Sequence, residues 1–339
     1  MSVLEQLPKG ASIAVIRLRS LGDAVLTTPA LQLIKKTRPD LRLNVLLDRS
    51  LAPLLEGSPA VDRVIVVDRG GPFYAALAAV RAERPALCWN LHGGSTSAWL
   101  TAFSGAKFRA GYTHFRLPLV YNVRIPRAQE ILSLDAKASV HTAEHHASAA
   151  FHLGATHAEI PAAALRAEAP EPVNPPYALL HVAAAYETKR WGAERFLEIG
   201  RFLAERRGLR PIVIAGPGDD RLLERFSEFE ARPALDLGAL KNLAAGASLF
   251  VGNDSGPAHV AAAFGVPCAV IFGSSNSRTW RPWGTRSETV ETEWDCKPCP
   301  GDRCYAFDEP RCILSVETGR VQAVIERLLD APSQAPSAE

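Results

Sequence analysis

The sequence predicts an α/β protein built from two doubly wound domains, each with a parallel sheet between helices. Three observations predict this fold class. Short apolar, β-branched segments alternate with helical segments along most of the chain, as in βαβ units. Residues 161–176 contain five prolines, which neither a helix interior nor a central strand accommodates. The length of 339 residues fits two domains of ordinary size.

The first half contains four apolar segments with the length of buried strands. Strands are expected at 12–18, 41–47, 63–67 and 86–90, and helical segments at 24–37, 51–55, 73–83, 96–103 and 141–153. Pro39 follows the first helix and Gly154 the last, and both residue types commonly end helices. The resulting alternation predicts an N-terminal domain over residues 1–160.

The same alternation restarts after the proline-rich segment 161–176, which is therefore predicted to be the domain linker. Strands are expected at 177–182, 210–215, 248–252 and 268–272, and helices at 193–207, 221–229, 257–264 and 316–329. The second domain is predicted to span residues 177–315, with a C-terminal helix over 316–332. Doubly wound domains bind ligands at the carboxyl ends of their strands, and a pair of them makes a cleft.

Composition excludes several classes of protein. Apolar residues make up 47% and charged residues 22%, values typical of globular proteins rather than disordered or fibrous ones. No run approaches the length of a membrane span, and no basic segment followed by an apolar stretch predicts a secretory signal. The net charge of +2 does not favour nucleic acid, but residues 1–170 carry 19 basic and 13 acidic side chains. This excess indicates an anionic partner for the first half, with scattered solvated charge as the alternative.

The turn Ser20-Leu-Gly-Asp23 joins the first strand to the first helix. Gly22 permits a tight turn and a close backbone approach. Asp23 is expected at the carboxyl end of the strand, where it is either a helix N-cap or a carboxylate base facing a ligand. Position alone leaves both interpretations open.

The segment Phe250–Gly265 has the pattern of a strand end followed by a helix N-terminus. Asp254 or Ser255 can cap the helix, and Gly256 would let a phosphate approach its free N–H groups. His259, about one turn into the helix, reaches the same ligand or is a structural histidine. Lys189, after the first strand of the second domain, can neutralise a leaving phosphate or be an ordinary surface lysine.

Taken together, these segments resemble glycosyltransferase family 9, the ADP-heptose heptosyltransferases of lipopolysaccharide core synthesis. The resemblance rests on Arg17-Leu-Arg-Ser-Leu-Gly-Asp23 with Thr28-Pro-Ala-Leu31, Lys189-Arg-Trp191, Gly252-Asn-Asp-Ser-Gly-Pro-Ala-His259, Gly265-Val-Pro267, Phe272-Gly-Ser-Ser275 and Trp280-Arg-Pro-Trp-Gly284. It implies the GT-B architecture, in which two Rossmann-like domains face each other across a cleft and the C-terminal helix often returns to the first domain.

The resemblance also implies an inverting transfer of heptose from ADP-heptose to an acceptor hydroxyl. Asp23 would be the general base and Lys189 would neutralise the diphosphate. The residues implied to bind the nucleotide sugar are Gly22, Thr188, Asp254, Ser255, Gly256 and His259. No cofactor is implied. The enzyme would act in the cytoplasm, at or near the inner face of the inner membrane. Asn90–Ser95 matches a family segment, but the arginine expected just after it is missing, which leaves the acceptor open.

Cysteine and histidine groups give weaker signals. Cys296, Cys299, Cys304 and Cys312 have the spacing C-x2-C-x4-C-x7-C, which suits either a tetrahedral zinc or iron site or simply reduced thiols. We expect no metal, because the second pair is not itself C-x2-C. Cys88 and Cys268 are expected in the core. The three histidines at positions 141, 145 and 146 are expected to be solvated.

Basic and aromatic residues alternate between positions 103 and 127. The basic ones are Lys107, Arg109, Arg116, Arg124 and Arg127, and the aromatic ones are Phe103, Phe108, Tyr112, Phe115 and Tyr121. They favour contact with a phosphorylated or acidic glycolipid acceptor, or with an anionic membrane surface. The rival functions are a transferase for another nucleotide sugar, a sugar-nucleotide epimerase of the same architecture, a Rossmann oxidoreductase and a silent binding module. A Rossmann oxidoreductase requires a G-x-G-x-x-G motif after a strand, and the first strand of this chain is not followed by one.

Overall fold

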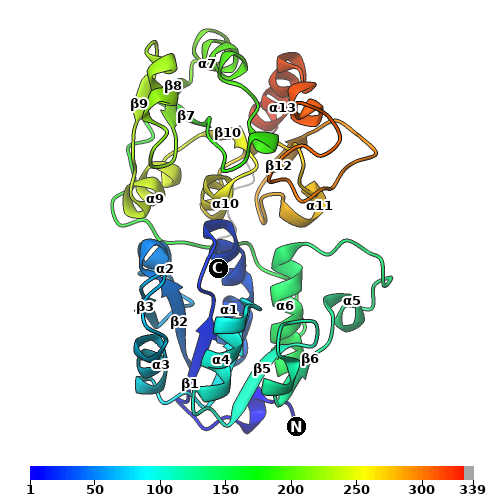
Figure 1. The fold of residues 1–339 in the computed structure, drawn as a ribbon. Helices are drawn as coiled ribbons and strands as arrows, with labels where there is room; N and C mark the ends of the chain where they lie inside the picture. Colours follow the sequence, from blue (N-terminus) through cyan, green and yellow to red (C-terminus); the bar gives the residue numbers. More distant parts are fainter. Residues whose placement is uncertain (332–339) are drawn as a thin grey trace. The chain divides into compact units, whose positions relative to one another are not determined.

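The computed structural model describes residues 1–331, and the chain divides into two compact units between Arg166 and Ala167. The first unit contains a six-stranded parallel sheet in the order β3-β2-β1-β4-β5-β6 (Figure 1). Its strands are β1 (Ser12–Ile16), β2 (Arg42–Asp48), β3 (Arg63–Val67), β4 (Leu87–Asn90), β5 (Phe108–Tyr112) and β6 (Val123–Ile125). Its helices are α1 (Leu21–Thr37), α2 (Ala52–Leu55), α3 (Phe73–Ala82), α4 (Ser95–Phe103), α5 (Ala128–Ile131) and α6 (Thr142–Leu153), with a 3-10 turn η3 (Pro118–Val120).

The second unit repeats this plan with the sheet order β12-β11-β10-β7-β8-β9. Its strands are β7 (Tyr177–His181), β8 (Arg210–Ile214), β9 (Glu230–Arg232), β10 (Leu249–Asn253), β11 (Cys268–Ile271) and β12 (Ser287–Val290). Its helices are α7 (Ala193–Arg207), α8 (Asp220–Leu223), α9 (Leu237–Ala245), α10 (Gly256–Ala263), α11 (Ser277–Trp280), α12 (Arg311–Leu314) and α13 (Thr318–Asp330), with the 3-10 turns η4 (Glu187–Lys189) and η5 (Glu224–Phe226). Within residues 1–331, no helix has both the length and the apolar character that crossing a membrane requires.

The two sheets share one topology, and each reverses its strand order once. The reversal falls between β1 and β4 in the first sheet and between β7 and β10 in the second. In doubly wound folds the carboxyl ends of the two strands that flank this reversal form the crevice that holds the ligand. Each unit therefore has a defined place for a site, reached from β1 and β4 in one and from β7 and β10 in the other.

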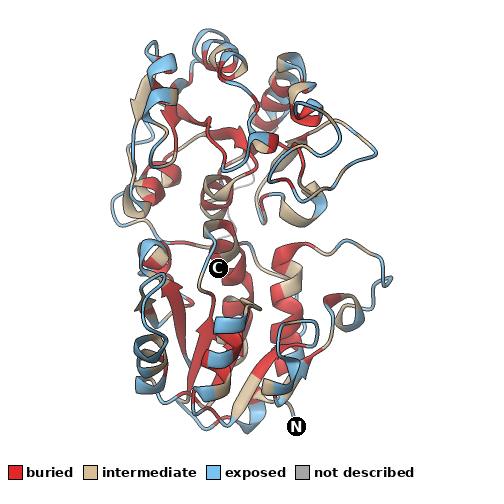
Figure 2. Cartoon of the chain, viewed as in Figure 1, coloured by how far each residue is buried: buried red, intermediate tan, exposed pale blue. Residues whose placement is uncertain are grey.

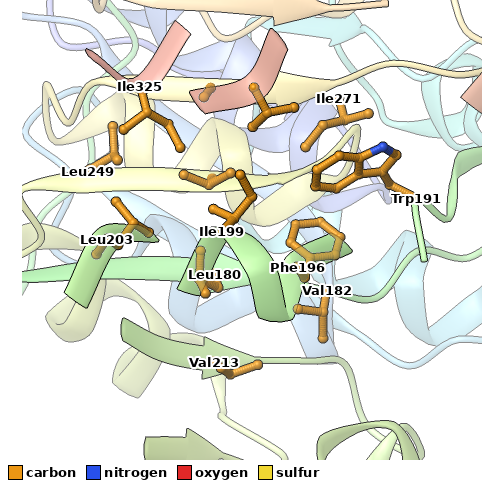
Figure 3. Close-up of a cluster of buried hydrophobic side chains, with 14 of the residues drawn as sticks. Leu180, Val182, Trp191, Phe196, Ile199, Leu203, Val213, Leu249, Ile271 and Ile325 are labelled. Carbon is orange, nitrogen blue, oxygen red and sulfur yellow. The ribbon is translucent and has the colours of Figure 1, made fainter. Parts of the chain in front are cut away.

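Buried strands form the centre of each unit, and the exposed helix faces lie outside them (Figure 2). In the second unit Trp191 is fully buried and packs edge-on against Phe196 of α7, with 5.1 Å between ring centroids (Figure 3). The indole N–H of Trp191 donates a 2.8 Å hydrogen bond to the carbonyl of Val316, so the polar end of this side chain is satisfied inside the core. This contact fixes the chain just after η4.

The C-terminal helix α13 belongs to the same core. Val321, Val324, Ile325 and Leu328 are buried in the cluster that contains Trp191, and α13 contacts α7, β11 and β12. Its apolar face is therefore used within the second unit, whereas the family resemblance implied a return to the first domain. Position 332 of the expected helix lies outside the described residues.

The proline-rich segment is extended and is held at both ends. Near its start, the amide of Ala164 donates to Thr28 Oγ1 of α1, at 3.0 Å. Further along, the amides of Glu168 and Ala169 both donate to Asn242 Oδ1 of α9, at 3.1 Å. The boundary between the two units falls inside this segment, between the two anchored parts.

Most predicted elements are present, and one helix is much shorter than expected. The helix predicted over 221–229 ends as α8 at Leu223 and continues only as the turn η5. The chain turns because Phe226 is buried in the core and the ring of Phe229 lies against Gly200, where a Cβ would meet it at 2.3 Å. The elements β5, β6, β9, β12 and α9 were not predicted, because they are short, carry charged residues or lie at sheet edges.

Candidate active site

Asp23 lies in the first turn of α1, at the carboxyl end of β1. Ser20, not Asp23, is the N-cap residue of this helix, so the capping interpretation of Asp23 is wrong. The carboxylate instead forms an ion pair with the guanidinium of Arg17 and accepts a 2.8 Å hydrogen bond from the hydroxyl of Ser20. Arg17 is buried and also donates to the carbonyl of Leu91, which follows β4. One guanidinium thus joins the ends of the two strands at the reversal of the first sheet.

Two neutral imidazoles lie close to this ion pair. Burial, followed by the positive charges of Arg17 and Arg19, lowers the pKa of His92 to about 4. Burial, followed by the charges of His114 and Arg17, lowers the pKa of His145 to about 4. Near neutral pH the positive charge around Asp23 therefore comes from arginine, and the histidines offer uncharged donors and acceptors. The prediction of solvated histidines is wrong, because His141 and His146 are buried and His145 is partly buried.

Gly22 is buried within the first turn of α1 and has no positive φ, so it does not serve as the tight turn expected from the sequence. A cavity of about 920 Å³ opens beside it, at the same sheet edge. Three arginines, Arg19, Arg69 and Arg116, line this cavity together with two aspartates, Asp48 and Asp68, and with His92 and the first residues of α4. Asp68 is already paired with Arg49, so the arginines remain in excess. The arginines come from the ends of three different strands or loops, and Arg69 was not singled out by sequence. Such a lining favours an anionic ligand.

In the second unit, Lys189 and Asp254 form a 2.7 Å ion pair across the ends of β7 and β10. The Asp254 side chain is 7% exposed and that of Lys189 is 24% exposed. Asn253 holds the two segments together, because its Oδ1 accepts from the amide of Trp191 and its Nδ2 donates to the carbonyl of Val182. The sequence brought these residues to one sheet edge but did not predict their pairing.

Ser255 is the N-cap residue of α10, and its side chain does not cap the helix. Its hydroxyl donates to the carbonyl of Asn253 at 3.0 Å and lies 2.9 Å from Nδ1 of His181. Burial lowers the pKa of His181 to about 4, so this imidazole is neutral near pH 7. The Ser255 hydroxyl is thus engaged outside α10, and Pro257, in the first turn, has no N–H. His181 was not predicted, because nothing in its local sequence distinguishes it from a core residue.

Two of the predicted donor-binding residues are buried. Thr188 donates from its hydroxyl to the carbonyl of Gly301 and accepts a 3.0 Å hydrogen bond from Ser274. His259 is 4% exposed and lies inside α10. The backbone of η4 also packs closely on Gly273, where a Cβ would lie 2.0 Å from the Thr188 carbonyl oxygen. Thr188 therefore connects η4 to the segment after β11 and to the cysteine-rich segment.

The four clustered cysteines line one cavity of about 220 Å³ behind Thr188. Cys296 is exposed, Cys299 and Cys304 are partly buried and Cys312 is buried. Within residues 1–331, no three cysteine, histidine or acidic side chains are arranged to hold a metal ion. Cys88 and Cys268 are buried in strands, as predicted.

The aromatic residues expected in the basic region differ in how far they are buried. Tyr112 and Tyr121 are buried, so they are core residues and not part of a contact surface. Phe108 and Phe115 are partly buried, and Phe103 is exposed.

Comparison with known proteins now adds to this geometry. A model of the family described as glycosyltransferase family 9 (heptosyltransferase) matches residues 75–306, well over half of the chain. The chain belongs to glycosyltransferase family 9. Lipopolysaccharide heptosyltransferase 3 of Escherichia coli K12 is 26% identical to it over 351 residues, covering 94% of this chain and 97% of the relative.

Solved structures similar to this family 9 chain confirm the predicted fold class. The E. coli ADP-heptose lps heptosyltransferase II superposes with a TM-score of 0.76 at 19% identity, covering 94% of this chain and 98% of the other. E. coli heptosyltransferase WaaC, solved with ADP, superposes with a TM-score of 0.72 at 21% identity, covering 94% and 99%. The family 9 chain is therefore a glycosyltransferase by family and has the two-unit fold of the heptosyltransferases.

Proposed function

We propose that this family 9 chain is an inverting glycosyltransferase that moves a heptose from ADP-heptose to an acceptor hydroxyl in lipopolysaccharide core synthesis. The observation that carries the proposal is the pair of polar sites at the two strand-order reversals. One holds a carboxylate, Asp23, and the other holds a lysine, Lys189, beside the start of α10. The relatives named lipopolysaccharide heptosyltransferase and the structure solved with ADP support this choice of substrates.

In this proposal Asp23 takes the proton from the acceptor hydroxyl as that oxygen attacks the anomeric carbon. Inversion requires the attack to come from the face opposite the ADP leaving group. The carboxylate is ready for this role because Arg17 and Ser20 fix its orientation. Both contacts hold the carboxylate at the carboxyl end of β1, where the acceptor hydroxyl would have to lie.

Lys189 and the N-terminus of α10 would bind the diphosphate and neutralise it as it leaves. Before the donor binds, Lys189 is neutralised by Asp254. A diphosphate carries more charge than one carboxylate, so it competes for the same ammonium group. Asp254 and Ser255, with Gly256, are proposed to contact the donor directly. Thr188 and His259 are buried, so they would hold the donor-binding segments in position. Gly22, in the first unit, is proposed to contact the nucleotide sugar.

The first unit is proposed to bind the acceptor, and the second to bind the donor. The cavity lined by Arg19, Arg69 and Arg116 favours a phosphorylated or acidic glycolipid, because three guanidinia can pair with phosphate or carboxylate groups. We therefore also propose that the enzyme acts in the cytoplasm, with peripheral contact to the inner face of the inner membrane, where a glycolipid acceptor would be presented. No cofactor enters the proposed reaction.

A thermal-shift screen tests the donor. ADP and ADP-heptose should raise the melting temperature, whereas UDP, GDP and NAD should not, because a ligand that binds only the folded state stabilises it by mass action. Stabilisation by UDP alone would favour the main rival, a sugar-nucleotide epimerase or a transferase for another nucleotide sugar. With ADP-heptose and an acceptor, NMR of the product should show an anomeric configuration opposite to that of the donor. A product with the donor's configuration would refute inversion.

A further inference from the structure

Large apolar side chains are exposed in one region of the first unit. Helices α3 and α4 contact each other, and α4 contacts the turn η3. These three elements and the residue before η3 expose six large apolar side chains, namely Phe73, Tyr74, Trp99, Phe103, Leu117 and Leu119. We call this set the α3–α4 patch. Tyr74 is 75% exposed and Leu119 is 83% exposed, values that a side chain packed within its own domain does not reach.

The outer face of α4 explains why this patch is unusual. Its inner face buries Ser97, Ala98, Leu100 and Thr101, so the helix is already anchored to the sheet. The outer face carries Trp99 and Phe103, one turn apart, whose rings stack with 5.6 Å between centroids. A helix on the surface of a domain ordinarily presents polar residues there. On α4 two large rings stand there instead, 44% and 47% exposed.

Basic residues outnumber acidic ones beside the patch, although the cavity that Phe73 lines also holds Asp48 and Asp68. Residues 73–124 contain six lysine or arginine residues and a single acidic one, Glu83, which is paired with Arg63. Arg81 of α3 donates to the carbonyl of Phe103, at 2.7 Å, and Arg109 donates to the carbonyl of Val120 in η3, at 3.0 Å. These bonds fix basic side chains at the edges of the same three elements.

Exposed tryptophan, tyrosine and phenylalanine beside basic residues are typical of a protein surface that binds an anionic bilayer. The rings enter the boundary between headgroups and acyl chains, and the basic groups are attracted to acidic lipid. We propose that the α3–α4 patch is the surface by which this enzyme docks on an anionic membrane. A second copy of the chain fits less well, because like charges around the patch would face each other.

This docking surface also lies next to the proposed acceptor cavity. Phe73 of the patch also lines that cavity. Ala76 of α3 and Leu100 of α4, which are not part of the patch, line it as well. An acceptor anchored in the bilayer by its acyl chains would thus present its sugar at the mouth of the arginine-lined cavity. This role in presenting the acceptor rests on the proposed function, but membrane binding itself can be measured with no donor or acceptor present.

The test is flotation with vesicles of phosphatidylcholine that contain about one third phosphatidylglycerol, compared with vesicles of phosphatidylcholine alone. The wild type should float with the acidic vesicles, and added salt should weaken the binding. The double variant Trp99→Ser/Phe103→Ser should bind at least about ten-fold more weakly, since it removes two inserted rings. Leu134→Ser is the matched control, because Leu134 lies in the same unit, is 44% exposed like Trp99, and is outside the patch.

The contribution of charge has its own pair of variants. Lys107→Glu, directly before β5, should weaken binding to acidic vesicles by at least roughly five-fold. Lys137→Glu, an exposed lysine elsewhere in the unit, should change it much less. All variants should keep the wild-type circular dichroism spectrum, which shows that they are folded.

Three results would overturn the proposal. The first is absence of the wild type from the vesicle fraction at low salt. The second is an equal loss of binding by Trp99→Ser/Phe103→Ser and by Leu134→Ser. A dimer in light scattering that the double variant abolishes, with no vesicle binding, would instead make the patch a contact between two copies. Loss of turnover with intact vesicle binding would count against the proposed reaction and leave the docking surface standing.

Discussion

Replacing Asp23 by asparagine tests the proposed base, and the structure changes what this variant should do to stability. Asparagine keeps the size of the side chain and can still accept hydrogen bonds from Arg17 and Ser20. It removes the basicity, so turnover should fall by roughly 10²–10⁴-fold. It also leaves the buried Arg17 guanidinium without a counter-charge.

The cost of that unpaired charge can be bounded from burial. Breaking a fully buried ion pair costs about 3–5 kcal/mol. The Asp23 side chain is 19% exposed and solvent screens part of the interaction, so we expect about 1–3 kcal/mol. For a unit of this size, each kcal/mol lowers the melting temperature by about 2–4 °C. Differential scanning calorimetry and turnover of ADP-heptose would measure the two effects on the same preparation.

The double variant Arg17→Met/Asp23→Asn separates the two effects. Methionine removes the buried charge, so stability should recover by at least about 1 kcal/mol relative to Asp23→Asn alone. Turnover should stay low, because the base is still missing. The reasoning fails if Asp23→Asn retains near-normal turnover, or if the double variant recovers turnover together with stability.

Three further variants probe the second unit. Lys189→Met should abolish most of the melting-temperature shift that ADP induces. It also leaves Asp254 buried and unpaired, so the free energy of unfolding should fall by about 1–3 kcal/mol. Unchanged ADP binding in calorimetry would contradict the role of Lys189. Gly273→Ala forces a Cβ against the Thr188 carbonyl, so it should lower the free energy of unfolding by about 1–3 kcal/mol and weaken ADP binding. A variant as stable as the wild type would be inconsistent with this packing. His181 binds its proton less readily when folded, so unfolding free energy should fall as pH drops from about 6.5 to 4, with about 1.4 kcal/mol per pH unit contributed by this group. His181→Asn should flatten part of that slope in urea titrations at several pH values, and an unaltered slope would exclude His181 as its source.

The sequence alone determined the fold class and the two segments that carry the proposed chemistry. Short β-branched runs, helix-ending prolines and glycines and one proline-rich segment are local signals, and they located most strands and helices. Asp23 and the segment from Gly252 to His259 were also visible, because each directly follows an apolar strand. Loop placement after a strand is a property of the neighbouring residues, so it can be recognised without the rest of the chain.

Tertiary structure alone decided which side chains meet. The Arg17 that pairs locally with Asp23 also reaches Leu91 after β4, and Lys189 after β7 pairs with Asp254 after β10. Both long-range contacts arise because these strands are neighbours where the strand order of each sheet reverses. Burial was decided in the same way. Within one basic and aromatic region, Tyr112 is covered by α6, where its ring stacks on His145, while Phe103 is left on the outer face of α4. The type of a residue sets how much free energy burial contributes, but the packing of distant elements decides which aromatic residues are buried and which remain exposed to a partner.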